Sequence, residues 1–218
     1  MSGGAHATDG AGRRQTVATT AGQAAISWFE AADARRVLAL GHGAGGGIEA
    51  RDLAVLAAAL PARGITVALV EQPWRVAGRK LAPAPRTLDA GWRGIFPALA
   101  EPGSPVVVGG RSAGARVACR TAVGTGAAGV LALAFPLHPP GRPERSRADE
   151  LPLGGPPLLV VQGGRDPFGR PAEFPAGVRL VEIPGADHSF AVPRRGELGQ
   201  EAALGLLTEA VAEWLLSG

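Results

Sequence analysis

Short runs of apolar and β-branched residues, each bounded by glycine or proline, alternate with longer amphipathic segments along most of this sequence. Residues 106–109 are typical of the short runs and suit a buried strand, whereas residues 113–123 repeat their apolar side chains at helical spacing. Strands that alternate with helices pair in parallel, because each helix carries the chain back to the start of the next strand. The sequence therefore predicts an α/β fold with a mostly parallel central sheet flanked by helices.

The two expected strands nearest the N-terminus have no helical segment between them, so we expect them to form an antiparallel edge of the sheet. The connections at residues 72–86 and 136–155 are rich in proline and arginine, and neither is long enough for a large cap. The expected strands lie near residues 16–19, 25–29, 37–40, 66–70, 106–109, 130–135, 158–161 and 178–183, and the expected helices cover residues 49–60, 87–99, 113–123 and 197–216.

Length and composition favour a single soluble domain. A chain of 218 residues that is 46% hydrophobic can bury a sizeable core. No apolar run approaches the ~20 residues that span a bilayer, and the first residues lack the apolar segment of a signal peptide. Cys119 is the only cysteine, which excludes an internal disulfide. We expect a disordered tail at residues 1–13, one domain at residues 14–218, and a cytoplasmic location without membrane contact.

The arginine residues are scattered, mostly singly or in pairs, and the formal net charge is only +3. Domains that bind nucleic acid instead gather basic residues on one surface. This distribution argues against a nucleic-acid partner. We therefore expect the partner to be a small molecule. The charge distribution does not indicate an oligomeric state.

Three residues with complementary chemistry each follow a predicted strand, namely Ser112, Asp166 and His188. Ser112 stands in Gly-Arg-Ser-Ala-Gly between a strand and a helix, which is the pattern of a nucleophile elbow. Each residue alone also suits a structural role, as a helix cap, a turn or a loop histidine. Because parallel strands end at the same edge of a sheet, we expect the three side chains to meet there.

Together these three side chains can perform nucleophilic catalysis. A serine hydroxyl becomes an effective nucleophile when an imidazole, here that of His188, takes its proton. A carboxylate, here that of Asp166, then orients the imidazole and stabilises its charged form. Asp187 is the rival acid, but it adjoins His188 in the sequence and is less well placed to reach the ring.

The glycine-rich segment at residues 41–47 (GHGAGGG) follows another predicted strand. Acyl transfer needs backbone N–H groups aimed at the developing oxyanion, and the loss of one such donor costs about 3 kcal/mol. We expect Ala113 to supply one N–H group and Ala44 or Gly43 to supply the other.

The same segment also fits a competing motif, because Gly41, Gly43 and Gly46 match the G-x-G-x-x-G of dinucleotide-binding folds. Glu71, at the end of the next strand, would be the ribose-binding acid. A chain with 33 glycines produces such matches easily, and this interpretation leaves the serine, the aspartate and the histidine without a role. It stays an alternative.

A further group of residues could line a substrate pocket. Arginines near the nucleophile would suit an anionic acyl or phosphate-bearing substrate. Bracing of loops is the alternative for these arginines, and it is slightly favoured. The histidines show no close ligand spacing, so we expect neither a metal nor another cofactor. The candidate pocket residues are Gly43, Trp74, Arg75, Arg79, Arg111 and His138.

The motifs together carry a family resemblance. They are HGAGGG (42–47), EQPWRVAGRK (71–80), GGRSAGAR (109–116), FPLHPPGRPE (135–144), QGGRDPFG (162–169) and GADHSF (185–190). From about residue 37 onward the sequence resembles the α/β-hydrolase fold superfamily, and within it small lidless hydrolases related to dienelactone hydrolases. A subgroup of these includes testis-expressed and chromatin-complex relatives in animals, some of which look like non-enzymatic scaffolds.

The resemblance implies a Ser-Asp-His triad in the chain order of this superfamily, carried here by Ser112, Asp166 and His188. Ser112 stands where dienelactone hydrolases themselves have a cysteine. We therefore expect a serine hydrolase that cleaves an ester or thioester through an acyl-enzyme on Ser112. The alternatives are a non-catalytic interaction module with the same fold and a dinucleotide-binding protein.

Overall fold

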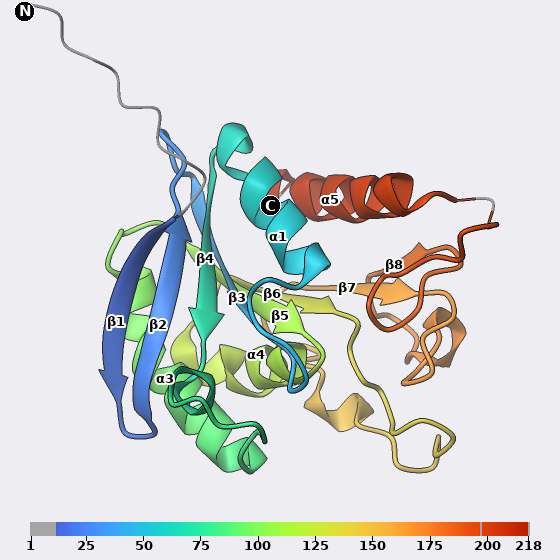
Figure 1. Cartoon of the computed structure of the whole chain (residues 1–218), viewed down its shortest axis with the longest axis horizontal. Coiled ribbons are helices and arrows are strands. Elements are labelled where there is room, and N and C mark those ends of the chain that lie inside the picture. Colours follow the sequence, from blue (N-terminus) through green and yellow to red (C-terminus); the bar gives the residue numbers. More distant parts are fainter. Residues whose placement is uncertain (1–11, 197, 218) are drawn as a thin grey trace, which may run out of the picture.

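The computed structural model describes residues 12–196 and 198–217 of the chain (Figure 1). Residues 1–11 of the expected N-terminal tail lie outside the described residues, and strand β1 begins at Arg13. A single sheet crosses the molecule and has helices on both of its faces (Figure 1).

Within the described part of the chain, eight strands form one sheet in the order β1-β2-β4-β3-β5-β6-β7-β8. Strand β2 runs antiparallel to both β1 and β4, and the other neighbouring strands pair in parallel. The N-terminal strands thus form an antiparallel edge, as the lack of a helix between them predicts. The strands are β1 (Arg13–Thr19), β2 (Gly22–Phe29), β3 (Arg36–Gly41), β4 (Ile65–Glu71), β5 (Val106–Arg111), β6 (Gly129–Leu133), β7 (Leu158–Gly163) and β8 (Leu180–Ile183).

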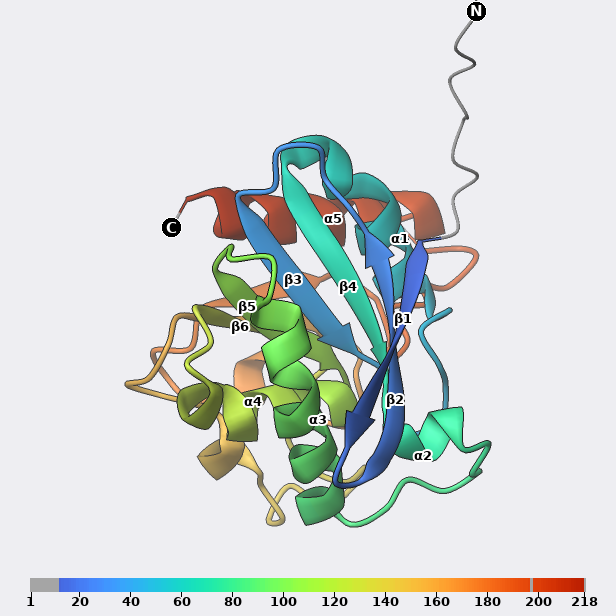
Figure 2. The ribbon, with the colours of Figure 1, turned by 90° about the vertical axis from the view of Figure 1, so that its left-hand side faces the viewer.

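Helices α1 and α5 cover one face of the sheet, and α3 and α4 cover the other (Figures 1 and 2). The buried apolar residues divide in the same way into two clusters. None of the helices in the described residues combines the length and the apolar character that a bilayer crossing requires. The helices are α1 (Arg51–Ala59), α2 (Pro73–Val76), α3 (Pro85–Ala100), α4 (Ala113–Thr125) and α5 (Gln200–Leu216), with short 3-10 turns at Pro61–Arg63, Ala148–Glu150 and Pro171–Glu173.

The predicted fold class is confirmed, and the described residues form a single α/β domain without a large cap. The sequence does not predict the short helix α2, which starts at Pro73, where the missing N–H group costs nothing. Strand β6 ends earlier than expected because the chain turns at Ala134, whose φ is +45°. The expected start of the last helix, Glu197, lies outside the described residues, and α5 begins at Gln200.

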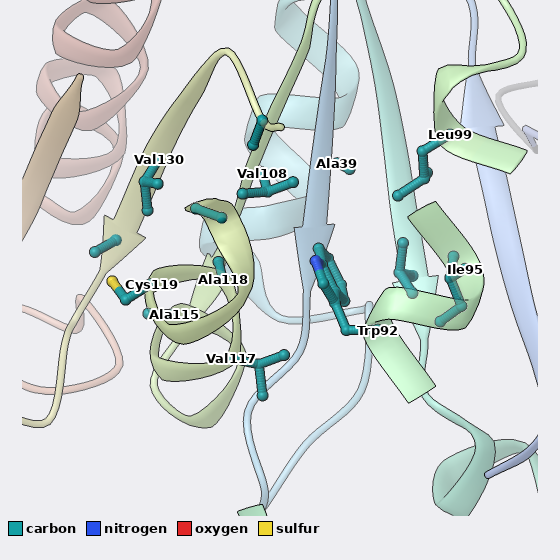
Figure 3. Packing of buried hydrophobic residues seen from close by; sticks show 14 of the residues in the cluster. Ala39, Trp92, Ile95, Leu99, Val108, Ala115, Val117, Ala118, Cys119 and Val130 are labelled. Carbon is teal, nitrogen blue, oxygen red and sulfur yellow. The ribbon is translucent and has the colours of Figure 1, made fainter. Parts of the chain in front are cut away.

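The core beneath one face of the sheet reaches the glycine-rich segment. Trp92 of α3 is completely buried, and its ring extends from the helix toward the strand that carries Ala39 (Figure 3). The same ring lies against Gly41, because a Cβ atom on that residue would be 3.1 Å from Trp92 Cζ3. The core packing therefore fixes the point at which the glycine-rich segment leaves the sheet.

Candidate active site

Ser112 occupies a sharp turn between strand β5 and helix α4. Its backbone has φ +51° and ψ −113°, a conformation that residues other than glycine rarely adopt. Gly110 and Gly114 pack on the main chain of Gly41 so closely that a Cβ atom on either would overlap the Gly41 carbonyl oxygen. The Ser112 side chain does not cap α4, and its hydroxyl instead bonds with His188. This is the geometry of a nucleophile elbow.

The His188 imidazole bridges the other two residues of the predicted triad. Its Nε2 lies 3.0 Å from Ser112 Oγ, and its Nδ1 lies 2.8 Å from Asp166 Oδ2. Because an ionised carboxylate only accepts hydrogen bonds, Nδ1 carries the proton and Nε2 can accept the proton of the Ser112 hydroxyl. The Phe168 ring lies against the imidazole, with ring centroids 4.2 Å apart, and limits its rotation.

The Asp166 carboxylate is completely buried and is hydrogen-bonded on both oxygens. Oδ1 accepts from the Phe168 N–H at 2.8 Å, and Oδ2 accepts from Gln162 Nε2 at 2.9 Å as well as from His188. Sequence reasoning did not single out Phe168 or Gln162. The glutamine did carry a signal, since it is a polar residue within the apolar run LLVVQG.

The neighbouring carboxylate of Asp187 makes different contacts. Its Oδ1 accepts from the N–H groups of Ser189 at 2.8 Å and Ala191 at 3.0 Å. Asp187 therefore shapes the loop that carries His188, whereas Asp166 contacts the ring.

The glycine-rich loop after β3 lies directly against Ser112. A Cβ atom on Gly43 would be 3.5 Å from Ser112 Cβ. His42 braces this loop, because its Nε2 accepts from the N–H of Gln72 at 3.3 Å and its Nδ1 donates to the Gly43 carbonyl at 2.8 Å. Burial is the largest influence on His42 and lowers its pKa, which favours the neutral ring that this arrangement requires.

Two adjoining hollows lie along the segment after β4, and the smaller one reaches the glycine-rich loop. The smaller hollow is lined by Gly43, Ala44 and Ala113, so the structure brings together the residues predicted for an oxyanion hole. The larger hollow, of about 270 Å³, lies between the β1–β2 hairpin, α2 and the start of α3. Gln72 and Trp74 line both hollows and connect them.

The other candidate pocket residues differ in their positions. Trp74 and Arg79 line the larger hollow. Arg75 lines neither hollow, and its guanidinium lies 3.8 Å from the carboxylate of Glu49 in an exposed ion pair.

His138 is buried away from both hollows and is held by two acceptors. Its Nδ1 lies 2.8 Å from the Pro139 carbonyl oxygen and its Nε2 lies 2.8 Å from a Glu173 carboxylate oxygen, so the protonated ring donates to both. These contacts raise the pKa of His138. Its bonds brace the loop after β6, which is the ordinary role of a loop histidine.

Arg111 also has its guanidinium engaged by protein groups. Its Nε donates to Asp52 Oδ2 at 3.0 Å, and its Nη2 donates to the His188 carbonyl at 2.8 Å. These bonds fit bracing better than contact with a substrate.

Cys119 on α4 is buried, and burial raises the pKa of its thiol to about 12, so the thiol stays protonated. The part of the chain that the structure describes holds no group of three or more histidine, cysteine, aspartate or glutamate residues placed to bind a metal ion.

Two features disfavour the dinucleotide interpretation of the glycine-rich loop. In dinucleotide-binding folds this loop leads straight into the helix whose N-terminus binds the pyrophosphate. Here α1 begins only at Arg51, well beyond Gly46. The carboxylate of Glu71, the candidate ribose-binding acid, forms an ion pair with Arg14.

Comparisons with known proteins point to one family. A family described as alpha/beta hydrolase domain matches residues 34–216. A serine hydrolase without a lid from Xanthomonas campestris has a TM-score of 0.70 and 21% identity, with 93% of this chain and 94% of that chain covered. Dienelactone hydrolase from Anabaena variabilis has a TM-score of 0.73 and 20% identity, with 94% and 96% covered. Est1E from Butyrivibrio proteoclasticus has a TM-score of 0.73 and 13% identity, with 94% and 98% covered. No curated protein matches the chain.

The family match covers most of the chain, and the solved structures share its fold over almost their whole length. Because the matching family consists of hydrolases, the match supports a hydrolase function for this chain. The chain therefore belongs to the alpha/beta hydrolase domain family.

Proposed function

We propose that the protein is a serine hydrolase that cleaves an ester or thioester through an acyl-enzyme on Ser112. The observation that carries this proposal is the His188 imidazole, which lies 3.0 Å from Ser112 Oγ and 2.8 Å from Asp166 Oδ2. Family membership supports hydrolysis as the reaction. The buried, fully hydrogen-bonded carboxylate of Asp166 supports these three residues as its catalytic groups.

In the first half-reaction, Ser112 Oγ attacks the carbonyl carbon while its proton passes to His188 Nε2. The N–H of Ala113 and that of Ala44 or Gly43 donate to the oxyanion of the tetrahedral intermediate. As the intermediate collapses, the bond to the alcohol or thiol breaks, and the leaving group takes the proton from His188. The product of this stage is an acyl ester on Ser112.

In the second half-reaction, a water molecule attacks the acyl carbon and gives a proton to His188 Nε2. The bond to Ser112 Oγ then breaks, the proton returns to the serine, and a carboxylic acid leaves. Asp166 keeps its negative charge throughout and stabilises the imidazolium that forms twice in each cycle. No cofactor is needed for these steps.

The larger hollow suggests the shape and chemistry of the substrate. Its volume of about 270 Å³ suits a compact group, and Trp74 gives it an apolar wall. Arg79 also lines this hollow, and an anionic group on the substrate would suit its guanidinium.

The test uses a fluorophosphonate, which labels activated serines without knowledge of the substrate. Mass spectrometry should locate one adduct on Ser112 in the wild-type protein. The adduct should be absent in Ser112→Ala and strongly reduced in His188→Ala. Ser189→Ala is the matched control, because Ser189 is an exposed serine in the loop that carries His188, and it should label like the wild type.

A wild-type protein that unfolds cooperatively but takes no adduct would contradict the proposal and favour an interaction module with the same fold. Equal labelling of His188→Ala would contradict the role of the imidazole as general base. After a positive result, esters and thioesters with the same acyl chain would distinguish the two bond types. The relation to the testis-expressed and chromatin-complex subgroup rests on the sequence resemblance alone.

A further inference from the structure

Arg111 lies where three segments around Ser112 meet. Its Nε donates to Asp52 Oδ2 of α1 at 3.0 Å, and its Nη2 donates to the main-chain carbonyl of His188 at 2.8 Å. Its Nη1 lies against the glycine-rich loop, since a Cβ atom on Gly43 would be 3.2 Å from it. One side chain next to the nucleophile thus touches the segments that carry the imidazole and the expected oxyanion donors.

The partner of Arg111 is an unusual carboxylate. Asp52 is 1% exposed. Its Oδ2 accepts a hydrogen bond from Arg111, whereas its Oδ1 has no partner within the described residues. Burial raises the pKa of Asp52, and the charge of Arg111 acts in the opposite direction. A buried ion pair contributes little to stability compared with apolar side chains of similar volume. The position of this ion pair beside Ser112 therefore indicates that it holds neighbouring segments in place.

Of the bonds that Arg111 makes, the one to the His188 carbonyl can affect the reaction of Ser112. Asp166 and Phe168 contact the His188 ring, whereas Arg111 bonds to its main chain. Arg111 ties that backbone to the strand end that carries Ser112. Asp52 in turn keeps the guanidinium in a single orientation.

We propose that Arg111, oriented by Asp52, is a positioning residue that fixes the main chain of His188 relative to Ser112. This inference rests on the proposed function, because it assigns Arg111 a role in the reaction of that serine. A displacement of about 1 Å between reacting groups can cost up to about 10²-fold in rate. Arg111→Gln should therefore slow the modification of Ser112 by about 10- to 100-fold.

The experiment measures the rate of fluorophosphonate labelling of Ser112, together with the Tm of each variant. Arg120→Gln is the matched control. Arg120 is also a half-buried arginine that forms ion pairs with two carboxylates, those of Asp89 and Glu150, but it lies about two turns of α4 beyond Ser112. It loses the same charge and similar bonds, so it should lower Tm without changing the labelling rate.

Two further variants separate positioning from simple destabilisation. Arg111→Lys keeps the charge but cannot donate to Asp52 and the His188 carbonyl together, so its labelling rate should fall between those of the wild type and Arg111→Gln. Asp52→Asn keeps Arg111 but weakens its orientation, and it should also label more slowly than Arg120→Gln. With an ester substrate, the loss in Arg111→Gln should appear in kcat and leave KM nearly unchanged, because Arg111 lines neither hollow.

The outcomes distinguish this inference from the function on which it rests. If the wild type takes no adduct, the proposed function fails and the inference fails with it. If the wild type is labelled and both Arg111→Gln and Asp52→Asn label as fast as Arg120→Gln, positioning is wrong and the hydrolase proposal stands. If Arg111→Gln does not fold, the rates of Arg111→Lys and Asp52→Asn decide, and wild-type rates in both would overturn the inference.

Discussion

Asp166 Oδ2 lies 2.8 Å from His188 Nδ1, although Asp187 is the immediate sequence neighbour of the histidine. The Asp187 carboxylate accepts instead from two main-chain N–H groups of its own loop. Two carboxylates close to one imidazole thus have separate tasks, one at the ring and one at the backbone. They form a matched pair for mutation.

Asp166→Asn should lower kcat for ester hydrolysis by about 10³- to 10⁴-fold, because an amide favours the wrong tautomer of His188. Asp187→Asn keeps an oxygen that can accept from the same N–H groups, so its kcat should stay within a few-fold of the wild type. The measurement is kcat for both variants with one ester. A large loss in Asp187→Asn alone would reverse the two assignments.

Gly114→Ala should destabilise the protein by about 1–3 kcal/mol. The added Cβ atom would lie 2.6 Å from the Gly41 carbonyl carbon and 2.9 Å from the His42 carbonyl oxygen, and main-chain atoms cannot move aside cheaply. Gly46→Ala is the control, because nothing lies within 4 Å of a Cβ atom there. Urea unfolding of both variants tests this, and equal stabilities would show that the elbow is less tightly packed than described.

His42 should make stability depend on pH. Because burial lowers its pKa in the folded state, the unfolded chain binds the proton more readily. The contribution of His42 is fully present above the unfolded pKa of about 6.5 and is lost as the pH falls below it, through the lower pKa of the folded state. The free energy of unfolding should therefore fall more steeply from pH 7.5 to about 5.5 in the wild type than in His42→Gln.

His138 is a control for that experiment, because its pKa shift, and so its effect on the pH dependence of stability, has the opposite sign. Its pKa is raised, so its contribution is fully present below the unfolded pKa and is lost as the pH rises through the folded value. Removal of His138 should thus reduce stability mainly at low pH. A pH profile of His42→Gln that matches the wild type would show that the protonation of His42 is not linked to folding.

Neither NAD nor NADP should raise the Tm. A ligand at a hundred times its Kd stabilises a folded protein by about 2.7 kcal/mol, which is about 5–10 °C for a chain of this length. The ion pair between Glu71 and Arg14 leaves the candidate ribose acid already engaged. A clear, saturable increase in Tm with either dinucleotide would revive the competing interpretation of the glycine-rich loop.

Cys119 should resist iodoacetamide at pH 8 in the native protein and react in urea. Burial raises the pKa of this thiol to about 12, so almost no thiolate is present, and the sulfur is shielded. Mass spectrometry of both samples tests the expectation. Rapid native alkylation would show that α4 opens readily from the sheet.

The sequence predicted those features that depend on local pattern. Apolar runs marked the strands, and the position of Ser112, Asp166 and His188 after strands predicted their meeting at one edge. Features that depend on contacts between distant segments stayed hidden. Asp52, in the first turn of α1, was not singled out from the sequence, and only the fold brings it to Arg111, 59 positions away.

The same reason explains the errors at strand and helix ends. Strand β6 ends at a turn in which Ala134 has a positive φ. Alanine rarely adopts this conformation, so the residue type does not predict the turn. Helix α2 is too short to produce a periodic pattern of apolar residues, and its only sequence signal is Pro73 at its first position. For the pocket, residue type alone did not distinguish Arg79, which lines a hollow, from Arg75, which does not.

The order of the strands separates the larger hollow from the three proposed reacting side chains along the chain. The proposed reacting side chains come from residues 112–188, after β5, β7 and β8, whereas every residue lining the larger hollow lies between Ala21 and Thr87. Substitutions at the residues that line the larger hollow, all within the first two fifths of the chain, could accumulate without changing Ser112, Asp166 or His188. The group that is bound could then diversify around the glycine-rich loop, while that loop and the three reacting side chains are inherited unchanged.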